Sequence, residues 1–536
     1  MWMQPIRKLT DAEMGIYIVA KGICFMPANF TSFYFLCFYA IILLIYYIIP
    51  RKMQWIFLLF ASAAFYLLTG NGILILYPVA ASLVAYISLR LMTGTEDVKK
   101  RRAALLFAVI SLIGALVALK YINFGINTVN GVASFLGKAE NMITPLQFLA
   151  PLGISFYTFS ILGYVIDVYN QIAEPQKNFL KLTLYGMYFP AILSGPILRY
   201  REDGEQFFAP HPFDYRQVTF GMQRMVWGFF KVLVISERMN LIVNTVYDNY
   251  VQYPGAYIWI ATICFAFQLY TNFSGSMDIA LGISQTFGIY LPENFETPFF
   301  SKNISEYWRR WHITLGVWMK EYIFYPLLRT SAFTNLGKKM RKKFGKKRGK
   351  QLTTFLAMFI LWFTVGIWHG GDWKFVIGSG LLHWFYIVSG ELLAPIFQKA
   401  MEKLRINPKG RWPDIFRMLR TFFLVNIGFV FFRAASAADG WKMLKSAVSV
   451  WNPKILVDGS LLMLGLDVIE AVIALVSLLV LWTISCLQQK GQVREKIEKQ
   501  KLPVRFLLWY ALLFYIILLG YYGPEYSAAE FIYQGF

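Results

Sequence analysis

The chain has 536 residues, of which 57% are hydrophobic, 18% aromatic and only 15% charged. A soluble protein carries about 25% charged residues. The composition therefore excludes an ordinary soluble enzyme and indicates a protein that lies mostly in a bilayer. The formal net charge of +22 could suggest nucleic acid as a partner, but the distribution of the basic residues favours a membrane protein with no nucleic acid bound.

Long apolar runs recur along the whole chain. A transmembrane helix needs about 20 apolar residues, so the runs predict about 11–13 transmembrane or re-entrant helices. We therefore expect an all-α, polytopic membrane protein. The clear runs are 32–49, 55–68, 73–89, 103–119, 182–193, 257–269, 353–367, 373–388, 421–432, 461–487 and 506–519, and the less clear stretches are 146–168, 216–245 and 306–330.

Basic residues gather in short connections between the apolar runs. The connection 338–350 contains nine Lys and Arg residues and no acidic residue. Because Lys and Arg of short loops stay in the cytoplasm, we expect this connection and 396–412 on the cytoplasmic side. The turn between them then lies toward the outer side or in mid-membrane. The same rule places 434–460 and the C-terminal tail outside.

His369 occupies that turn, in the sequence GIWHGGDWKF. An ionisable side chain at membrane depth is costly and is therefore a functional candidate. The Gly370-Gly371 pair lets the backbone pass close to a substrate and supplies N–H groups for an oxyanion. We predict His369 as a catalytic base and the two glycines as substrate-binding residues. The alternative is a structural histidine bonded to a neighbouring carbonyl.

The region 267–326 begins apolar and then loses hydropathy without becoming a soluble linker. Gly275, Gly282, Gly288 and Pro292 predict breaks in any continuous spanning helix. Irregular backbone at membrane depth is tolerated where it is buried in protein or lines a water-filled cavity. A substrate cavity is therefore expected here.

An aromatic and basic stretch follows from Glu306 to Tyr325 and predicts a helix at the headgroup level. On such a helix Trp308, Arg309 and His312 share one face. A neighbouring cation lowers the pKa of a histidine and favours its neutral form, which can accept a proton or orient a partner. His312 is therefore the second catalytic candidate. An interfacial anchor explains the aromatic side chains but not this histidine.

Other chemistries find little support in the sequence. The motifs HExxH, GxSxG, GxxxxGK[ST] and GxGxxG are absent, and the four cysteines are scattered. A metal site made of His369, Asp372 and His383 lacks a fourth ligand, so no metal is predicted. His383 is expected to be a packed core residue and His211 a loop residue. Base catalysis without a metal or a serine nucleophile remains.

Several motifs resemble the membrane-bound O-acyltransferase family. Within that family they resemble the bacterial branch that contains the alginate O-acetylase membrane subunit and the D-alanyl-lipoteichoic acid transferase. The similarity runs from about Phe33 to the C-terminus. Its motifs are PLGISFYTFSILGYVIDVY at 151–169, FPAILSGPILRY at 189–200, FQLYTNFSGSMDIALG at 267–282, LPENFETPF at 291–299, RRWHI at 309–313 and WHG at 368–370.

The resemblance implies a ring of helices around a thin centre, with an outer funnel and a narrow cytoplasmic passage. It implies that His369 is the family's invariant histidine and His312 its second frequent one. We expect substrate contacts from Trp308, Arg309, Ser274 and Asp278 as well. Asn272 departs from the acid common in the acetylase branch, so its role stays open. The expected organisation is an N-terminal, possibly interfacial extension at 1–31, a catalytic core at 32–460, and C-terminal transmembrane helices with an outer tail at 461–536.

The predicted reaction is acyl transfer from a thioester to a hydroxyl, with a neutral imidazole taking the proton. We expect no bound cofactor. The donor is acetyl-CoA or an acyl carrier protein, and the acyl group is expected to be acetyl. The expected partners are membrane lipid, an extracytoplasmic SGNH-type acetyltransferase or esterase-like protein, and a cell-surface polysaccharide acceptor at the cell membrane.

Four alternatives stay open. Within the family, the reaction could be D-alanyl transfer to teichoic acid or O-acetylation of peptidoglycan. A proton-coupled transporter would explain the intramembrane histidine and the broken region, but not the motif set. A lipid-linked glycosyltransferase would need acidic metal-binding pairs in an outer loop, and the outer loops offer none.

Overall fold

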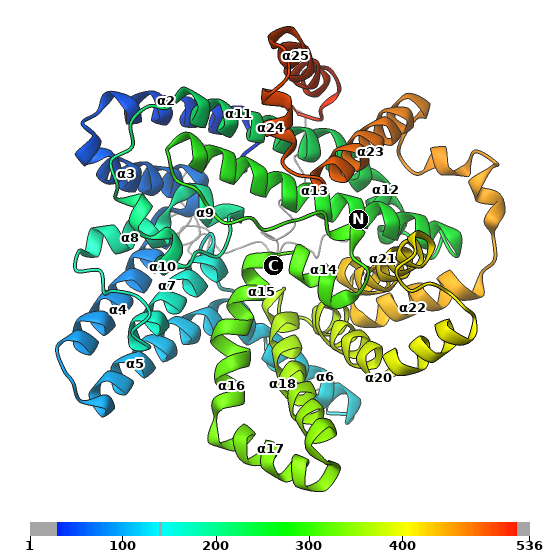
Figure 1. Ribbon diagram of the computed structural model, residues 1–536, viewed down its shortest axis with the longest axis horizontal. Coiled ribbons are helices and arrows are strands. Elements are labelled where there is room, and N and C mark those ends of the chain that lie inside the picture. The colour runs from blue at the N-terminus through cyan, green and yellow to red at the C-terminus, as the bar shows by residue number, and fades with distance from the viewer. Residues whose placement is uncertain (1–28, 139–141, 523–536) are drawn as a thin grey trace. The chain divides into compact units, whose positions relative to one another are not determined.

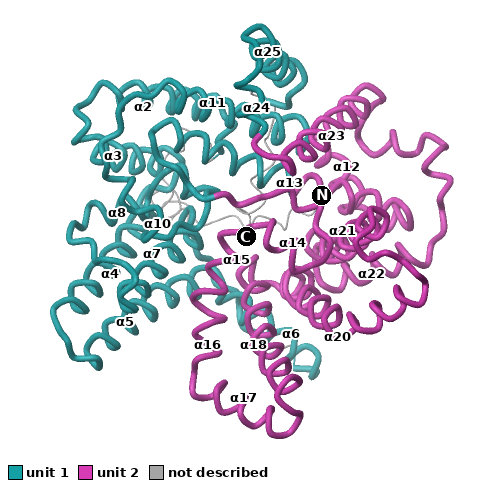
Figure 2. Tube along the Cα trace, in the orientation of Figure 1, with its two compact units in different colours: residues 1–237, 270–292, 493–535 teal, residues 238–269, 293–492, 536 magenta. Residues whose placement is uncertain are grey.

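The computed structural model describes residues 29–138 and 142–522. These residues form helices and no β-strands, which agrees with the predicted all-α class. They divide into two compact units (Figure 2). Unit 1 contains the described residues of 1–237, 270–292 and 493–535, and unit 2 contains 238–269 and 293–492. Residues 1–28 of the expected N-terminal extension and residues 523–536 of the expected outer tail lie outside the described residues.

Unit 1 is built around an aromatic core. The ring of Tyr164 stacks on that of Tyr200 with centroids 4.0 Å apart, and Tyr185 packs edge-on against Tyr200 and Phe207. Because these rings bury large apolar areas, they hold helices α7, α8 and α10 together. The α-helices of unit 1 are α2 (Phe33–Ile48), α3 (Gln54–Tyr66), α4 (Leu76–Thr93), α5 (Val98–Leu116), α6 (Ile122–Phe135), α7 (Ile154–Tyr169), α8 (Phe179–Met187), α9 (Phe189–Ser194), α10 (Tyr200–Asp203), α11 (Tyr215–Phe229), α24 (Val493–Glu498) and α25 (Leu502–Leu519).

Unit 2 holds both predicted catalytic histidines. Helix α17 packs against the start of α18 (Figure 1). Gly349 permits this contact, because a Cβ atom there would lie 2.4 Å from the Arg341 backbone nitrogen. The helices of unit 2 are α12 (Glu237–Asp248), α14 (Ile304–Arg310), α15 (Ile313–Met319), α16 (Tyr325–Arg329), α17 (Ser331–Phe344), α18 (Lys346–Trp368), α19 (Trp373–Phe375), α20 (Leu382–Lys403), α21 (Arg411–Arg433), α22 (Ala437–Ser449) and α23 (Val468–Gln488). Helix α13 (Ala256–Thr286) contributes to both units.

Eight helical segments of the described chain are long and apolar enough to cross a membrane. Two shorter apolar helices, α2 and α7, add to these. The number of membrane helices predicted from the sequence is higher, partly because the segment Arg51–Thr93 contains two predicted apolar runs, 55–68 and 73–89. These runs join at a kink where Gly70 adopts φ 75°. The eight segments are Arg51–Thr93, Val98–Phe135, Ala256–Thr286, Lys346–Trp368, Trp373–Lys403, Arg411–Arg433, Val468–Gln488 and Leu502–Leu519.

Helix α13 corrects the prediction of a broken segment. It continues without a break through Gly275 and Gly282. A Cβ atom on Gly282 would lie 2.6 Å from the Gly221 carbonyl oxygen, and one on Gly275 would lie 2.9 Å from that of Gly228. These glycines therefore serve close helix packing, which small residues permit in membrane proteins. The helix ends only at Thr286.

The predicted helix from Glu306 to Tyr325 is also wrong in one respect. Helix α14 ends at Arg310, Trp311 is extended, and His312 adopts left-handed backbone angles of φ 48° and ψ 52° before α15 begins. Trp308, Arg309 and His312 therefore do not share a helix face. The interruption turns the His312 side chain into the core of unit 2, where it is fully buried.

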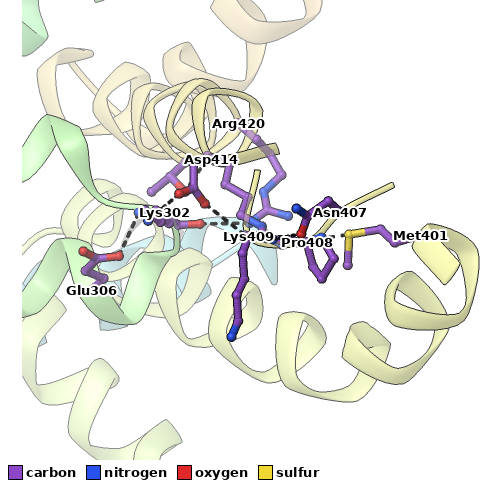
Figure 3. A network of polar contacts seen from close by, with 10 residues as sticks. Lys302, Glu306, Met401, Asn407, Pro408, Lys409, Asp414 and Arg420 are labelled. Carbon is purple, nitrogen blue, oxygen red and sulfur yellow. Dashed lines mark hydrogen bonds and ion pairs between the residues drawn. The ribbon is translucent and has the colours of Figure 1, made fainter. Parts of the chain in front are cut away.

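A polar network anchors the start of α14 to α21 (Figure 3). Lys302 donates from Nζ to Asp414 Oδ2 at 2.7 Å, and its backbone N–H donates to Glu306 Oε2 at 2.9 Å. Arg420 donates to the Lys302 carbonyl at 3.2 Å, and Arg417 pairs with Asp414 at 3.1 Å. The segment that leads to His312 is thereby fixed to a long helix of the same unit.

Candidate active site

His369 lies at the C-terminal end of α18 and is 2% exposed. The chain turns there because Gly371 adopts a left-handed φ of 59°. The N–H groups of Gly370 and Gly371 donate to the Ile367 carbonyl at 3.2 and 2.9 Å. Both N–H groups therefore help to end the helix, and their role as oxyanion donors stays a prediction. The substrate-binding role of the two glycines stays a prediction.

Phe375 packs directly on the glycine turn. A Cβ atom on Gly370 would lie 2.4 Å from Cε2 of the Phe375 ring. The Phe375 ring lies against Phe432 with centroids 4.9 Å apart, and Phe432 lies against His369 at 5.8 Å. A glycine at position 370 is therefore part of the packing that holds the His369 ring.

Close glycine contacts position the segments on both sides of this turn. The π-helical turn η10 (Val376–Leu381) follows α19. A Cβ atom on Gly366 of α18 would lie 2.6 Å from Cα of Val376, and one on Gly378 would lie 2.7 Å from the Gly428 carbonyl oxygen of α21. Backbone thus packs on backbone, which leaves these helices little freedom to shift.

His312 and His369 both contact the indole of Trp368. The His312 and Trp368 ring centroids lie 5.4 Å apart, and those of Trp368 and His369 lie 5.2 Å apart. The structure therefore brings the two predicted catalytic histidines to one side chain. Burial first, and the neighbouring His369 second, hold the pKa of His312 well below its ordinary value. The lowered pKa of His312 agrees with the prediction. Its cause does not, because the expected neighbour Arg309 is exposed and the pKa is lowered by burial and by His369 instead.

The motifs LPENFETPF (291–299) and RRWHI (309–313) are joined by backbone hydrogen bonds beside His312. Phe295 forms an antiparallel bridge with Trp311, and the Glu296 N–H donates to the Arg310 carbonyl at 2.9 Å. Asn294 is fully buried and contacts the His312 ring, with 3.3 Å between its Oδ1 and Nδ1 of the histidine. Asn294 was not among the predicted site residues, because no local sequence pattern shows that position 294 meets position 312.

Trp308 and His383 belong to an aromatic cluster in unit 2. The ring centroids of Trp308 lie 5.0 Å from those of both Trp362 and His383. His383 is thus a packed core residue, as expected.

Asp372, the third residue of the metal site considered above, accepts a hydrogen bond from the Lys374 N–H at 2.9 Å and so caps α19. Within the described residues, no three His, Cys, Asp or Glu side chains gather in a way that could hold a metal.

Ser274 and Asp278 lie in unit 1, on the second half of α13, so they are not in the unit that holds the two histidines. Asp278 pairs with Lys231 at 2.5 Å and with Arg224 at 2.9 Å. Lys231 also donates to Ser274 Oγ at 2.9 Å. These residues form an ion cluster in which Lys231 is buried and Asp278 and Arg224 are half-buried. Contact of Ser274 or Asp278 with substrate stays a prediction, as it does for Trp308 and the exposed Arg309.

Residues 171–408 match the model of the membrane-bound O-acyltransferase family. The matched region contains His312, His369 and Asn294. The chain therefore contains a domain of this family. It is an O-acyltransferase and a multi-pass membrane protein, which in bacteria means the cell membrane. The sequence motifs therefore led to the correct family and class of enzyme.

Three relatives of this acyltransferase illustrate the range of its family. A probable alginate O-acetylase AlgI of Pseudomonas aeruginosa is 29% identical over 425 residues, covering 78% of this chain and 75% of the relative. A peptidoglycan O-acetyltransferase of Helicobacter pylori is 28% identical, covering 66% of each chain. A teichoic acid D-alanyltransferase of Bacillus subtilis is 28% identical, covering 56% of this chain and 72% of the relative. All three names describe acyl transfer to a polymer of the cell surface.

Proposed function

We propose that this acyltransferase O-acetylates a cell-surface polysaccharide outside the cytoplasmic membrane, using an acetyl thioester supplied from the cytoplasm. The observation that carries the proposal is the pair of buried imidazoles of His312 and His369 on the indole of Trp368. A neutral imidazole in a buried site is a suitable base for a hydroxyl group, which is a weak nucleophile at neutral pH.

In the proposed reaction the polysaccharide hydroxyl attacks the thioester carbonyl. His369 takes the hydroxyl proton as the new C–O bond forms. The tetrahedral intermediate then breaks its C–S bond, and the proton passes from His369 to the leaving thiolate. The products are an acetyl ester and a free thiol. The chain itself supplies base catalysis and a buried site from which bulk water is excluded.

The relatives support acetyl as the acyl group. The alginate O-acetylase of P. aeruginosa covers 78% of this chain, whereas the D-alanyltransferase of B. subtilis covers 56%. The chain also continues through α23 and α25, beyond the region that matches the family model. We propose that the part beyond residue 460 helps to dock an extracytoplasmic SGNH-type or esterase-like partner. An acyl carrier protein remains the alternative to acetyl-CoA as donor.

Deleting the gene and analysing the surface polymers after mild base treatment tests the proposal. We expect loss of base-released acetate with D-alanine unchanged, and recovery with a plasmid copy of the gene. Loss of D-alanine with acetate intact would assign the protein to D-alanyl transfer. Analysis of the purified peptidoglycan separates acetylation of that polymer from acetylation of an exopolysaccharide.

A further inference from the structure

Asn294 makes three polar contacts through one side-chain atom. Its Oδ1 accepts from the Thr314 backbone N–H at 3.0 Å and from the Thr314 hydroxyl at 3.0 Å. The same Oδ1 lies 3.3 Å from Nδ1 of His312. All three residues are buried in unit 2.

The Thr314 backbone decides which way the Asn294 amide points. A backbone N–H can only donate, so the atom that faces it must be the amide oxygen. Rotating the amide would place its NH₂ group against that N–H and would bring two donors together. The orientation of Asn294 is therefore fixed by chemistry and not by a choice between similar atoms.

The oxygen in turn decides which nitrogen of His312 carries the proton. A carbonyl oxygen of an amide has no hydrogen to give, so Nδ1 of the histidine must be the donor in this contact. A neutral imidazole has one N–H, and its other nitrogen then carries the lone pair. We propose that Asn294 is a positioning residue that fixes His312 as its Nδ1–H tautomer, with Nε2 as the basic nitrogen.

The same residue also holds the backbone on which the ring is mounted. The Ile313 N–H donates to the Asn294 carbonyl at 3.1 Å, and the Thr314 N–H donates to its side chain. Between these anchors and α14, His312 keeps its left-handed φ of 48°, a conformation that non-glycine residues seldom adopt. Asn294 therefore sets both the position of the ring and the placement of its proton.

This tautomer limits what His312 can do in the proposed acetyl transfer, and that consequence rests on the proposed function. A neutral His312 with its proton on Nδ1 can accept a hydrogen bond at Nε2, and it can orient the attacking hydroxyl in that way. It cannot donate from Nε2 to an oxyanion. The proposed tautomer therefore favours the acceptor role that the sequence predicts for this histidine.

The tautomer can be measured without any assay of activity. The chain has only four histidines, so the full-length protein labelled with ¹³C,¹⁵N-histidine in a lipid bilayer gives four imidazole spin systems. The His312→Gln variant identifies the signal of His312 by its loss. We expect the nitrogen and carbon shifts of an Nδ1–H imidazole for His312. An Nε2–H imidazole in the wild-type protein would overturn the proposal.

Three variants test whether Asn294 is the cause. Asn294→Leu removes the acceptor and should release the tautomer and lower kcat about 10- to 100-fold with little change in KM. Asn294→Asp keeps an oxygen acceptor and should keep the Nδ1–H form. Thr314→Val is the matched control, since it removes one contact to the same oxygen and leaves the histidine contact in place.

The spectra separate this proposal from the proposed function. An unchanged His312 tautomer in Asn294→Leu would overturn the positioning role. If Asn294→Leu does not fold, a change of tautomer in Thr314→Val or its loss in Asn294→Asp would overturn it instead. An Nδ1–H His312 in a protein that acetylates no polymer would leave the positioning role intact and would contradict only the proposed function.

Discussion

Gly370 and Phe375 pack so closely that a Cβ atom added to the glycine would lie 2.4 Å from Cε2 of the phenylalanine ring. The Phe375 ring is buried against Phe432, which in turn contacts the His369 ring. A change at position 370 therefore reaches the catalytic histidine through two aromatic contacts.

Gly370→Ala is expected to destabilise the protein by about 1–3 kcal/mol, because the Phe375 ring has to move in a packed core. Acyl transfer should fall by about 100-fold, since small displacements of catalytic groups have effects of that size. Thermal unfolding in detergent and an acetylation assay measure the two effects. Gly390→Ala is the control, because no atom lies within 4 Å of its added Cβ. Phe375→Leu should partly rescue Gly370→Ala, and an undiminished activity in Gly370→Ala would contradict the packing argument.

His369→Ala is expected to reduce acyl transfer by about 100- to 10,000-fold, the range found for general base catalysis. Membrane insertion and the size of the detergent-extracted protein should not change. His312→Ala should reduce acyl transfer less than His369→Ala does, because a residue that only orients the hydroxyl supplies only part of the lowering of the activation barrier. Measuring polymer acetylation in cells that express equal amounts of each variant checks both expectations.

His383 provides the matched control for these two variants. It is a third buried histidine of unit 2, and its Nδ1 has no hydrogen-bond partner within the described residues. His383→Leu should therefore keep the activity near wild type, while the lost ring contacts with Trp308 and Trp362 should lower the stability by about 1–3 kcal/mol. Near-normal acetylation by His369→Ala would show that His369 is structural.

Asp278 and Asp414 each lie between two cations but differ in burial. Asp278 pairs with Lys231 and Arg224 inside unit 1, whereas Asp414 pairs with Lys302 and Arg417 at a more exposed place in unit 2 (Figure 3). Removing one partner of a largely buried ion cluster leaves a charge that water reaches poorly. Exposed pairs contribute little to stability.

Asp278→Asn is therefore expected to lower the free energy of unfolding by about 3–5 kcal/mol. Asp414→Asn should have a much smaller effect, and it serves as the control for the loss of one carboxylate. Thermal unfolding of both variants in the same detergent checks the difference. A stable Asp278→Asn protein that fails only in acyl transfer would favour the substrate contact predicted from sequence over the structural role.

The sequence predicted the parts of the site that depend on local chemistry. Helix α18 ends at Trp368, as the His-Gly-Gly sequence predicts, because a glycine such as Gly371 readily adopts the left-handed conformation that ends a helix. The choice of His369 rested on the rarity of ionisable groups at membrane depth. His312 was chosen because an interfacial anchor does not explain a histidine there, and the structure places both rings on one indole.

The rest depends on contacts between distant segments. Nothing between Ile304 and Ile313 is a helix breaker, and the break at His312 is held by Asn294, which lies 18 positions away. The opposite error occurred at Gly275, where a residue that disfavours helices locally is required for close packing of two helices. Tertiary contacts overrode local propensity in both cases.

The basic connection around α17 and the start of α18 gives a direct test of sidedness. Lys346 and Asp458 are both exposed in the structure. The positive-inside rule places Lys346 in the cytoplasm and the segment with Asp458 outside.

Single cysteines at these two positions, in a chain whose four native cysteines are replaced, should react differently with a thiol reagent that does not cross the membrane. In intact cells the cysteine at Asp458 should be labelled and the one at Lys346 protected, and both should be labelled after permeabilisation. A third cysteine at Gly410 should behave like that at Lys346. Labelling at Lys346 in intact cells would invert the topology, and the turn with His369 would then lie toward the cytoplasm. Export of the acetyl group would in that case need a second protein.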